Sequence, residues 1–521
     1  MAITPVTKNR VTGLASGMET DTIVKNMLAS YQAKLDKQNQ TTTKLQWKAD
    51  ALRSVNSLIK TFRESNLSVL NASSNMLSAS AYSAFDVAML TTTSAVTVKA
   101  GASATEGKVT INSITQLAEA ASLSSTDVFT TELNRDTALK DLAFTNALTF
   151  EQNGDVKEVK FSINNVDFTF NEDTLLSDMM SEINASDAGV KISYSSLKDG
   201  FTITSKTTGS ASKIDIKNTA GNMFSYVDTE GHTVAGALGI AAQTKNGQDA
   251  VLKIDGYDVV KSSNTFTIDG ITYTLNDKYI PADENDKGIS FSVTKNVDAV
   301  VDKISKFVDS YNELIGKLQS MVGEDVYRSY SPLTDAQKEE MSDSDIEKWE
   351  EKAKSGMLHN DSGIQSLLTT VRKALYTTVE GTGMKLSDIG LTTGAYTDGA
   401  KITLNKDKLK KALETNPDAV TSLFVKTSKS TDANTKFNES GFVARLSDSL
   451  LSYTKQATDV SLDAVEDSIS DSKEEVGKLE DKLSAKSDAL YLKFSAMEAA
   501  LAKLNSQSSW LSSLFSSTSS S

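Results

Sequence analysis

The chain has 521 residues, a net charge of −14 and a hydrophobic fraction of 39%. The length predicts three or four folded units, and the acidic balance argues against nucleic acid or an anionic membrane as the main partner. The absence of cysteine excludes disulfides, thiolate metal sites and a cysteine nucleophile.

The start of the chain and its apolar runs bear on where the protein works. Residues 1–21 contain no apolar stretch of the kind found in secretory signal peptides, and no apolar run is long enough to span a bilayer. We therefore expect no membrane insertion. The protein is expected to be cytosolic, or exported by a route that needs no cleaved signal peptide.

A long helix is predicted from about Thr20 to about Leu70. Its seam positions follow alternating steps of three and four, as in a coiled coil. They are Val24, Leu28, Tyr31, Leu35, Gln38, Thr42, Leu45, Ala49, Leu52, Val55, Ile59 and Phe62. Because Gln38 and Thr42 place polar side chains in the seam, we expect a discontinuity in the helix, or a change of partner, between Gln38 and Leu45.

Residues 80–295 predict small β-rich modules, because Thr, Ser, Val and Ile alternate there between turn signals. The expected hairpin turns are Asn164-Asn165, Asp199-Gly200, Asp255-Gly256 and Asp269-Gly270. One amphipathic helix interrupts the strands, with Leu176 and Ile183 on its apolar face. Asp173 or Thr174 is its expected N-cap.

Helices return after residue 296. A pattern of fours and threes runs from Val297 to Val322, and a charged insert, residues 331–356, follows it. A further helix is expected around residues 367–375. After it come a hairpin turning at Asp398-Gly399 and a helix that stops before Pro417.

The C-terminal helix carries the most regular pattern. Apolar residues recur there every seven positions, at Leu462, Ile469, Val476, Leu483, Leu490, Met497 and Leu504. The second seam position is apolar at Val465, Leu479, Phe494 and Leu501, but Lys486 and Lys493 stand between them, so the stripe slips by one residue. A stripe this narrow predicts a single partner helix, and the N-terminal helix is the candidate.

Helices at both ends and β modules between them predict a nested organisation. The expected fold class is multidomain α+β, with an antiparallel N-/C-terminal coiled-coil leg, a helical-bundle domain and two inserted β-rich modules. The expected parts are residues 1–42 with 455–521 for the leg, 43–78 with 296–454 for the helix-rich domain, 79–125 with 246–295 for the inner β-rich module, and 126–245 for the outer, variable β-rich module.

The sequence offers little for catalysis. Its two histidines, His232 and His359, lie in unrelated segments and are interpreted as solvated loop residues. The spacings of phosphate-binding loops, zinc-protease helices and nucleophile elbows do not occur. We therefore expect no enzyme activity, no catalytic residue, no cofactor and no metal site.

The apolar stripes are the candidate interaction surface. Packing within the chain is the simpler interpretation of such a stripe, and pairing of the two end helices partly satisfies it. The candidate interface residues are Val24, Leu28, Tyr31, Leu35, Leu45, Leu483, Leu490, Phe494, Met497, Leu501 and Leu504. Beyond them, the tail residues Trp510, Leu511, Leu514 and Phe515 favour self-association or a dedicated partner, such as a chaperone.

Several motifs, taken in order, resemble one known family. Residues 13–18, Gly-Leu-Ala-Ser-Gly-Met, precede Asp-Thr-Ile-Val at residues 21–24. This segment resembles the N-terminal signature of the flagellar filament-capping family, also called flagellar hook-associated protein 2. Residues 108–125, 293–318 and 386–424 are similar to later motifs of the same family.

The resemblance implies an extracellular protein at the tip of the bacterial flagellar filament. Such proteins form a ring homo-oligomer with helical legs, and they promote the folding and insertion of flagellin. The implied partners are other copies of the chain, flagellin, hook–filament junction proteins and a cytosolic export chaperone that binds near the C-terminus. Some members of the family also bind host mucin.

Two alternatives stay open on the residues alone. Another flagellar axial protein, either a flagellin or a hook–filament junction protein, would share the heptad ends and the lack of cysteine. A surface adhesin would use the outer module, residues 126–245, and that role is compatible with capping. For a cap, the legs are expected to stay mobile until they dock.

Overall fold

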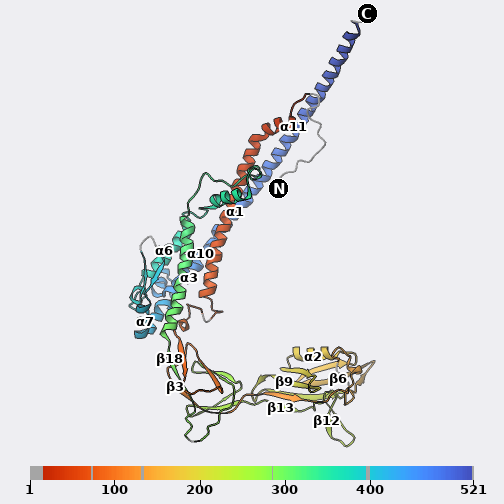
Figure 1. Ribbon diagram of the computed structural model, residues 1–521, viewed down its shortest axis with the longest axis vertical. Coiled ribbons are helices and arrows are strands. Elements are labelled where there is room, and N and C mark those ends of the chain that lie inside the picture. Colours follow the sequence, from red (N-terminus) through yellow and green to blue (C-terminus); the bar gives the residue numbers. More distant parts are fainter. Residues whose placement is uncertain (1–15, 72–73, 131–133, 284, 395–398, 519–521) are drawn as a thin grey trace. The chain divides into compact units, whose positions relative to one another are not determined.

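The computed structural model describes residues 16–71, 74–130, 134–283, 285–394 and 399–518. The chain divides into two compact units (Figure 1). Unit 1 consists of residues 1–82 and 297–521, and unit 2 consists of residues 83–296. The four-part division expected above is finer than this one and stays a prediction.

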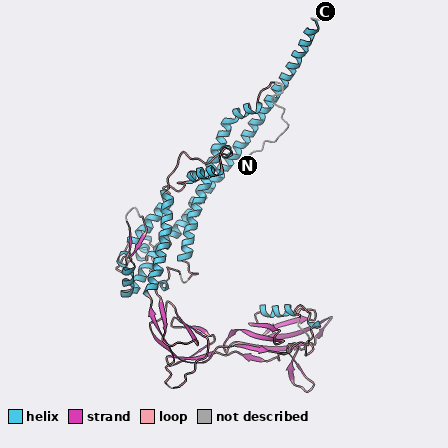
Figure 2. Ribbon diagram, in the orientation of Figure 1, coloured by secondary structure: helices cyan, strands magenta, loops and turns pink. Residues whose placement is uncertain are grey.

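Unit 1 is mostly helical (Figure 2). Its two longest helices are α1 and α11, which come from opposite ends of the chain. The elements of unit 1 are α1 (Thr20–Asn66), η1 (Ala79–Tyr82), α3 (Val297–Gly323), α4 (Asp335–Glu339), α5 (Asp343–Lys354), α6 (Ser362–Tyr376), η3 (Leu386–Ile389), β19 (Leu391–Thr393), β20 (Ile402–Leu404), α7 (Lys406–Thr415), α8 (Pro417–Val425), α9 (Ala433–Glu439), α10 (Phe442–Gln456), a π-helical turn (Ala457–Leu462) and α11 (Asp463–Thr518).

A helical bundle forms where the C-terminal half of α1 packs with α3, α6, α7, α8 and α10. Ile59 and Ile315 are fully buried there. The rings of Phe62 and Phe307 lie 6.0 Å apart, which brings α1 against α3. The Tyr311 hydroxyl donates to the carbonyl oxygen of Ala400 at 2.6 Å, so this buried polar group is satisfied.

Short polar residues set the helix starts in the bundle. Asp361 caps α6 by accepting from the amides of Gly363 and Ile364. Asn416 caps α8, whose first residue is Pro417. Proline is favoured at that position because its missing N–H would be unpaired there in any case. Helix α7 thus ends before Pro417, as expected.

Helix α1 runs from Thr20 to Asn66 without a break. The expected discontinuity between Gln38 and Leu45 is therefore absent as a helix break. What changes along α1 is its set of neighbours, because the Gln40 side chain donates to the carbonyl oxygen of Pro332 at 2.7 Å. A polar seam residue does not interrupt a helix whose backbone hydrogen bonds are all made within the helix.

The C-terminal helical path contains one irregularity. Helix α10 continues through the π-helical turn Ala457–Leu462 into α11. Such a turn holds an extra residue compared with an α-helical turn. It lies at the level where the helical path passes from the bundle to its pairing with α1.

Unit 2 is built from antiparallel strands and one helix. Its strands are β1 (Phe85–Met89), β2 (Val96–Ala100), β3 (Gly107–Gln116), β4 (Ala120–Ser124), β5 (Glu151–Asn153), β6 (Val156–Ile163), β7 (Val166–Asn171), β8 (Val190–Ser195), β9 (Gly200–Thr208), β10 (Lys213–Ala220), β11 (Ser225–Val227), β12 (Thr233–Ala235), β13 (Thr244–Asn246), β14 (Ala250–Ile254), β15 (Tyr257–Lys261), β16 (Thr265–Ile268), β17 (Ile271–Leu275) and β18 (Ile289–Lys295). A short 3-10 turn, η2 (Leu139–Asp141), and the helix α2 (Leu176–Ala185) complete it.

The inner part of unit 2 contains two sheets. One has the strand order β1-β18-β3-β14-β15, and the other has the order β16-β17-β2. Ile111, Leu252 and Phe291 are buried in the core that these sheets share.

The outer part of unit 2 has a separate core. Sheet β4-β9-β8 and sheet β13-β10-β6-β5, with β7 beside β6, bury a group of phenylalanines together with α2. The expected N-cap of α2 is wrong. Leu175 occupies the N-cap position and makes no side-chain cap bond, while the Thr174 hydroxyl donates to Asn171 instead.

Three hairpins of unit 2 have the expected turns. Asn164 and Asn165 both have positive φ, at 51° and 67°, between β6 and β7. Asp255-Gly256 joins β14 to β15 and Asp269-Gly270 joins β16 to β17, again with positive φ at both residues. Asn, Asp and Gly tolerate this conformation, which matches the twist of the paired strands.

The ends of each insertion lie side by side. Strands β1 and β18, which begin and end unit 2, pair with Phe85 opposite Lys295. The chain enters the outer part near Glu119 and leaves it near Gln248, and these two residues form an antiparallel β-bridge. Together with the packing of α1 on α11, these features confirm the expected α+β fold class.

Candidate functional site

Helices α1 and α11 pair in an antiparallel arrangement. The Tyr491 hydroxyl donates to Asp21 at 2.8 Å, and the Arg53 guanidinium lies 2.7 Å from the carboxylate of Glu466. Early residues of α1 therefore meet late residues of α11. We refer to Thr20–Leu45 with Ile469–Leu501 as the terminal helix pair.

A polar layer crosses the terminal helix pair near the end that adjoins the bundle. The Gln38 amide donates to the Ser472 hydroxyl at 2.8 Å, and Thr42 and Ser472 share a hydrogen bond of 2.7 Å. Thr42 and Ser472 are both buried. A buried polar layer of this kind fixes the register of two helices at some loss of stability.

The candidate interface residues differ in burial. Val24 and Leu35 are buried, with 2% and 4% of their surfaces exposed. Leu504 is exposed. The half-buried residues are Leu28, Tyr31, Leu45, Leu483, Leu490, Phe494, Met497 and Leu501. Two helices therefore cover only part of each stripe.

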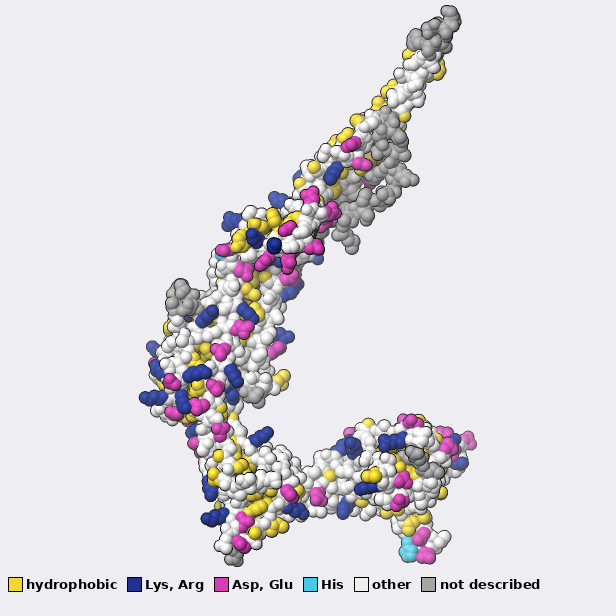
Figure 3. Space-filling view, viewed as in Figure 1, with side chains coloured by type: hydrophobic (Ala, Val, Ile, Leu, Met, Phe, Trp, Pro, Cys, Tyr) yellow, Lys and Arg dark blue, Asp and Glu magenta, His cyan; other side chains and the backbone are white. Residues whose placement is uncertain are grey.

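Helix α11 extends well past the start of α1. Ser16 contacts Glu498 through its backbone amide and its hydroxyl, and α11 then continues to Thr518. Trp510 and Leu511 on this extension are 63% and 51% exposed, and Figure 3 shows hydrophobic side chains spaced along it. The side chains of the other two tail residues, Leu514 and Phe515, lie outside the described part.

Arg445, on α10, joins the ends of two other helices, and no sequence pattern predicted this role. Its side chain is 2% exposed, and all five of its N–H groups donate to backbone carbonyl oxygens. The acceptors are Ala374, Thr377, Thr378, Phe437 and Asn438. These carbonyls lie at the C-terminal ends of α6 and α9, where helices leave acceptors unpaired. Burial lowers the pKa of Arg445 to about 10, so the side chain stays charged at neutral pH.

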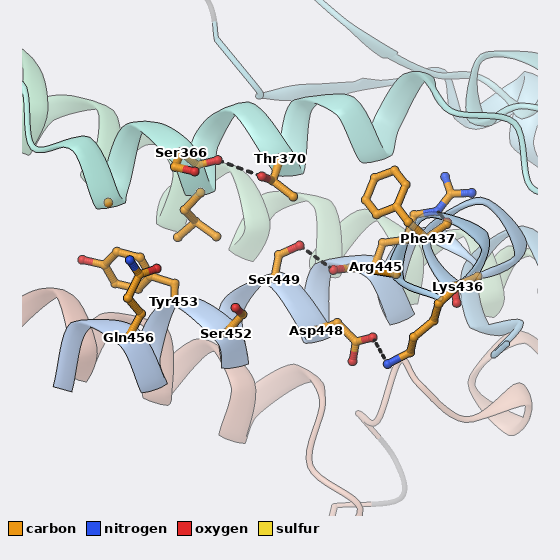
Figure 4. A pocket seen from close by; sticks show the side chains of 14 residues that line it. Ser366, Thr370, Lys436, Phe437, Arg445, Asp448, Ser449, Ser452, Tyr453 and Gln456 are labelled. Atoms are coloured by element: carbon orange, nitrogen blue, oxygen red, sulfur yellow. Dashed lines mark hydrogen bonds and ion pairs between the residues drawn. The ribbon is translucent and has the colours of Figure 1, made fainter. Parts of the chain in front are cut away.

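A cavity of about 300 Å³ lies beside Arg445 (Figure 4). Hydroxyl side chains line it, but Thr370 and Ser449 donate to carbonyl oxygens of their own helices. Lys436 and Asp448 pair at 2.7 Å across its edge. The side chains of Thr370, Ser449, Lys436 and Asp448 already have bonding partners within the bundle. We therefore interpret the cavity as part of the bundle.

Both histidines are exposed. His232 is exposed on the hairpin between β11 and β12, and His359 is an exposed loop residue whose ring contacts the carbonyl oxygen of Glu324. Within the described residues, no group of three acidic or histidine side chains is arranged to hold a metal ion. Among the same residues, none of the helices has the length and apolar character needed to cross a membrane.

Comparison with known proteins points to one family. A family model described as "Flagellar hook-associated protein 2 N-terminus" matches residues 16–121, and one described as "Flagellar hook-associated protein 2 C-terminus" matches residues 247–506. The residues between the two matches belong to the outer part of unit 2.

Individual relatives agree with the family models. Flagellar hook-associated protein 2 of Halalkalibacterium halodurans is 31% identical over 487 residues, which cover 85% of this chain and 86% of that one. The protein of the same name from Escherichia coli K12 is 25% identical over 96% of this chain and 97% of its own. A crystal structure of the D1-D2-D3 domains of the Escherichia coli flagellar cap protein covers 80% of this chain and 99% of its own, with 22% identity and a TM-score of 0.49.

Proposed function

Because the chain belongs to the flagellar hook-associated protein 2 family, the caps of the flagellar filament, we propose that it forms a ring at the filament tip with its terminal helix pair as a leg. The family is structural and not enzymatic, and it acts outside the cell at the end of the filament. Membership of this family argues against the alternative that the chain is a flagellin or a hook–filament junction protein. The leg of the proposed ring is residues 1–42 with 455–521.

One observation carries the proposal of a leg that docks. Helix α11 continues for some twenty residues beyond its contact with Ser16, and Leu504, Trp510 and Leu511 are exposed on this extension. Apolar surface of this kind marks a binding site for other molecules. The half-covered stripe of the terminal helix pair adds to it, because a neighbouring copy can cover the open flank.

The proposed partners follow from where this surface lies. Other copies of the chain cover the flanks of the terminal helix pair, and flagellin and hook–filament junction proteins meet its free end. Before export, a cytosolic chaperone covers the tail residues Trp510, Leu511, Leu514 and Phe515. The cap then promotes the folding and insertion of arriving flagellin.

An adhesive role for the outer module, residues 126–245, together with the adjoining strand β4, is the second candidate. One face of sheet β4-β9-β8 presents small hydroxyl side chains, and those of Ser124 and Thr202 lie 3.2 Å apart across two strands. Hydroxyl groups donate and accept hydrogen bonds, which suits the sugars of host mucin. Binding of soluble mucin glycans to the full chain, and its loss in Thr202→Val, would support this role. Equal binding by Thr202→Val would place the glycan elsewhere.

The proposal is tested on the full-length protein by electron microscopy and light scattering. The variant Leu504→Ser/Trp510→Ser/Leu511→Ser should reduce ring formation or its retention at filament tips, and cells carrying it should lose flagellin to the medium. Leu197→Ser is the control, because Leu197 is 94% exposed between β8 and β9 and lies outside the proposed leg. Rings and filaments of normal abundance in the triple variant would contradict the proposal.

A further inference from the structure

We propose that residues 324–361, which join α3 to α6, act as a splint that holds α1 straight where it leaves the bundle. This segment, called the splint below, contains the charged insert with α4 and α5. It belongs to unit 1 together with α1 and α11. The inference concerns the stiffness of the single chain and does not depend on its partners. It departs from the expectation that the legs stay mobile until they dock, because it makes α1 stiff at residues 38–45 in the free chain.

Two side-chain interactions join the splint to α1. The Gln40 side chain donates to the carbonyl oxygen of Pro332 at 2.7 Å. Two turns further along α1, the Lys354 ammonium lies 5.0 Å from the centre of the Trp47 ring. The two points are about 10 Å apart along the helix, so they restrain its direction as well as its position.

The splint and α11 hold opposite sides of α1. Gln38 and Thr42 face Ser472 of α11, whereas Gln40 faces the splint. Positions two apart on a helix differ by about 200° around its axis, which places them on opposite faces. At this level α1 is therefore held from both sides.

The splint is itself well ordered by its own contacts. The Trp349 indole N–H donates to the carbonyl oxygen of Ser331 at 2.8 Å, and its ring lies 4.6 Å from that of Tyr330. Glu350 pairs with Lys338 at 2.8 Å and with Lys354 at 3.2 Å. A segment braced in this way can transmit a restraint from the bundle to α1.

The restraint falls at a polar level of the seam. The polar layer of Gln38, Thr42 and Ser472 lies beside the contact at Gln40, and a polar layer contributes less to pairing than apolar seam residues do. Without the splint, this is the level at which α1 would bend away from α11 first. The structure thus supplies a second support where the seam is polar.

The contact between splint and helix is open enough to be weakened by point substitutions. A cavity of about 430 Å³ lies between α1, the end of α3 and the splint, lined among others by Trp47, Met321, Met357 and Leu358. Because neither Gln40 nor Lys354 is buried in the core, both side chains can be removed without changing a core residue.

Distance measurements between two spin labels test the splint. The chain has no cysteine, so Lys34→Cys and Lys306→Cys place single labels on exposed sites of α1 and α3 without background. The parent should give a narrow distance distribution. Gln40→Ala/Lys354→Ala should broaden it and speed amide exchange across residues 38–45 about tenfold, the effect of losing a neutral hydrogen bond and a cation–π contact.

The matched control is Gln32→Ala/Lys48→Ala, which removes the same two residue types from α1 away from the splint contacts. It should keep the narrow distribution and the slow exchange. A broad distribution in the parent would overturn the proposal, and so would an unchanged distribution in Gln40→Ala/Lys354→Ala. Equal broadening in the control would overturn it too, because the effect would then come from α1 alone.

Discussion

The bundle and the terminal helix pair use the same helix, α1, but bury it to different depths. In the bundle, Val55 and Ile59 have no exposed surface, because several helices surround them. In the terminal helix pair, Leu28 and Leu483 occupy equivalent seam positions and are only half buried. The same spacing of apolar residues therefore forms a buried core where several helices surround α1, and a half-buried seam where α1 has a single partner helix.

The largest effect is expected where a charge holds the bundle together. Arg445→Met should destabilise the helical unit by about 3–5 kcal/mol, because it leaves five buried carbonyl oxygens without their donor. The helical circular dichroism signal during urea unfolding measures this, since unit 1 contains nearly all of the helix described. Arg445→Lys should rescue only part of the loss, because an ammonium cannot reach all five acceptors. A change under 1 kcal/mol in Arg445→Met would mean that water replaces the guanidinium.

A matched pair of truncations compares the two regions directly. Ile59→Ala in the bundle should cost about 3 kcal/mol, and Leu483→Ala in the terminal helix pair should cost about 1 kcal/mol. The difference follows from the apolar surface that each side chain buries. The same urea unfolding experiment measures both. Equal costs would show that the terminal helix pair is as well packed as the bundle, and the comparison would fail.

The smallest effect concerns the charges of the splint at low pH. Lys338 hydrogen-bonds Glu350, and Lys354 adds to its effect, so the pKa of Glu350 lies below its ordinary value of 4.5. A carboxyl group with a lowered pKa in the folded state stabilises the fold above pH 4.5, and this is lost as the pH falls through the lowered value. Trp349 fluorescence should therefore change as the splint loosens below pH 4.5.

The control for the pH effect is Glu350→Gln. This variant should already show loosened splint fluorescence at pH 7, and its remaining change below pH 4.5 should be smaller than in the parent. If both proteins follow the same curve down to acidic pH, the ion pairs of Glu350 do not order the splint.

Features that depend on residues close together in the sequence were predictable. The spacing of apolar residues located α1, α3 and the C-terminal helix, because helix periodicity is a property of neighbouring positions. Asn164-Asn165 and Asp255-Gly256 located hairpin turns, because few residues tolerate positive φ. The family motifs led to the filament cap, which the family match confirms.

Features that depend on distant residues were not predictable. The five acceptors of Arg445 come from two stretches of chain that no local pattern links to α10. In the sequence, Gln40 is one more polar position on a helix, and only the fold shows that it contacts Pro332. The N-cap of α2 was wrong for a local reason, since the Thr174 hydroxyl donates to Asn171, three residues before it, and Leu175 takes the cap position. The candidate interface residues stay a prediction until partners are seen.

The side-by-side ends of the insertions have an evolutionary consequence. Because Phe85 pairs with Lys295, and Glu119 bridges to Gln248, whatever lies between each pair leaves and returns at one place. The sequence between the paired ends can therefore be exchanged, enlarged or lost during evolution without altering the helices that precede and follow it. Changes in the inserted sequence can then accumulate independently of changes in the helical unit.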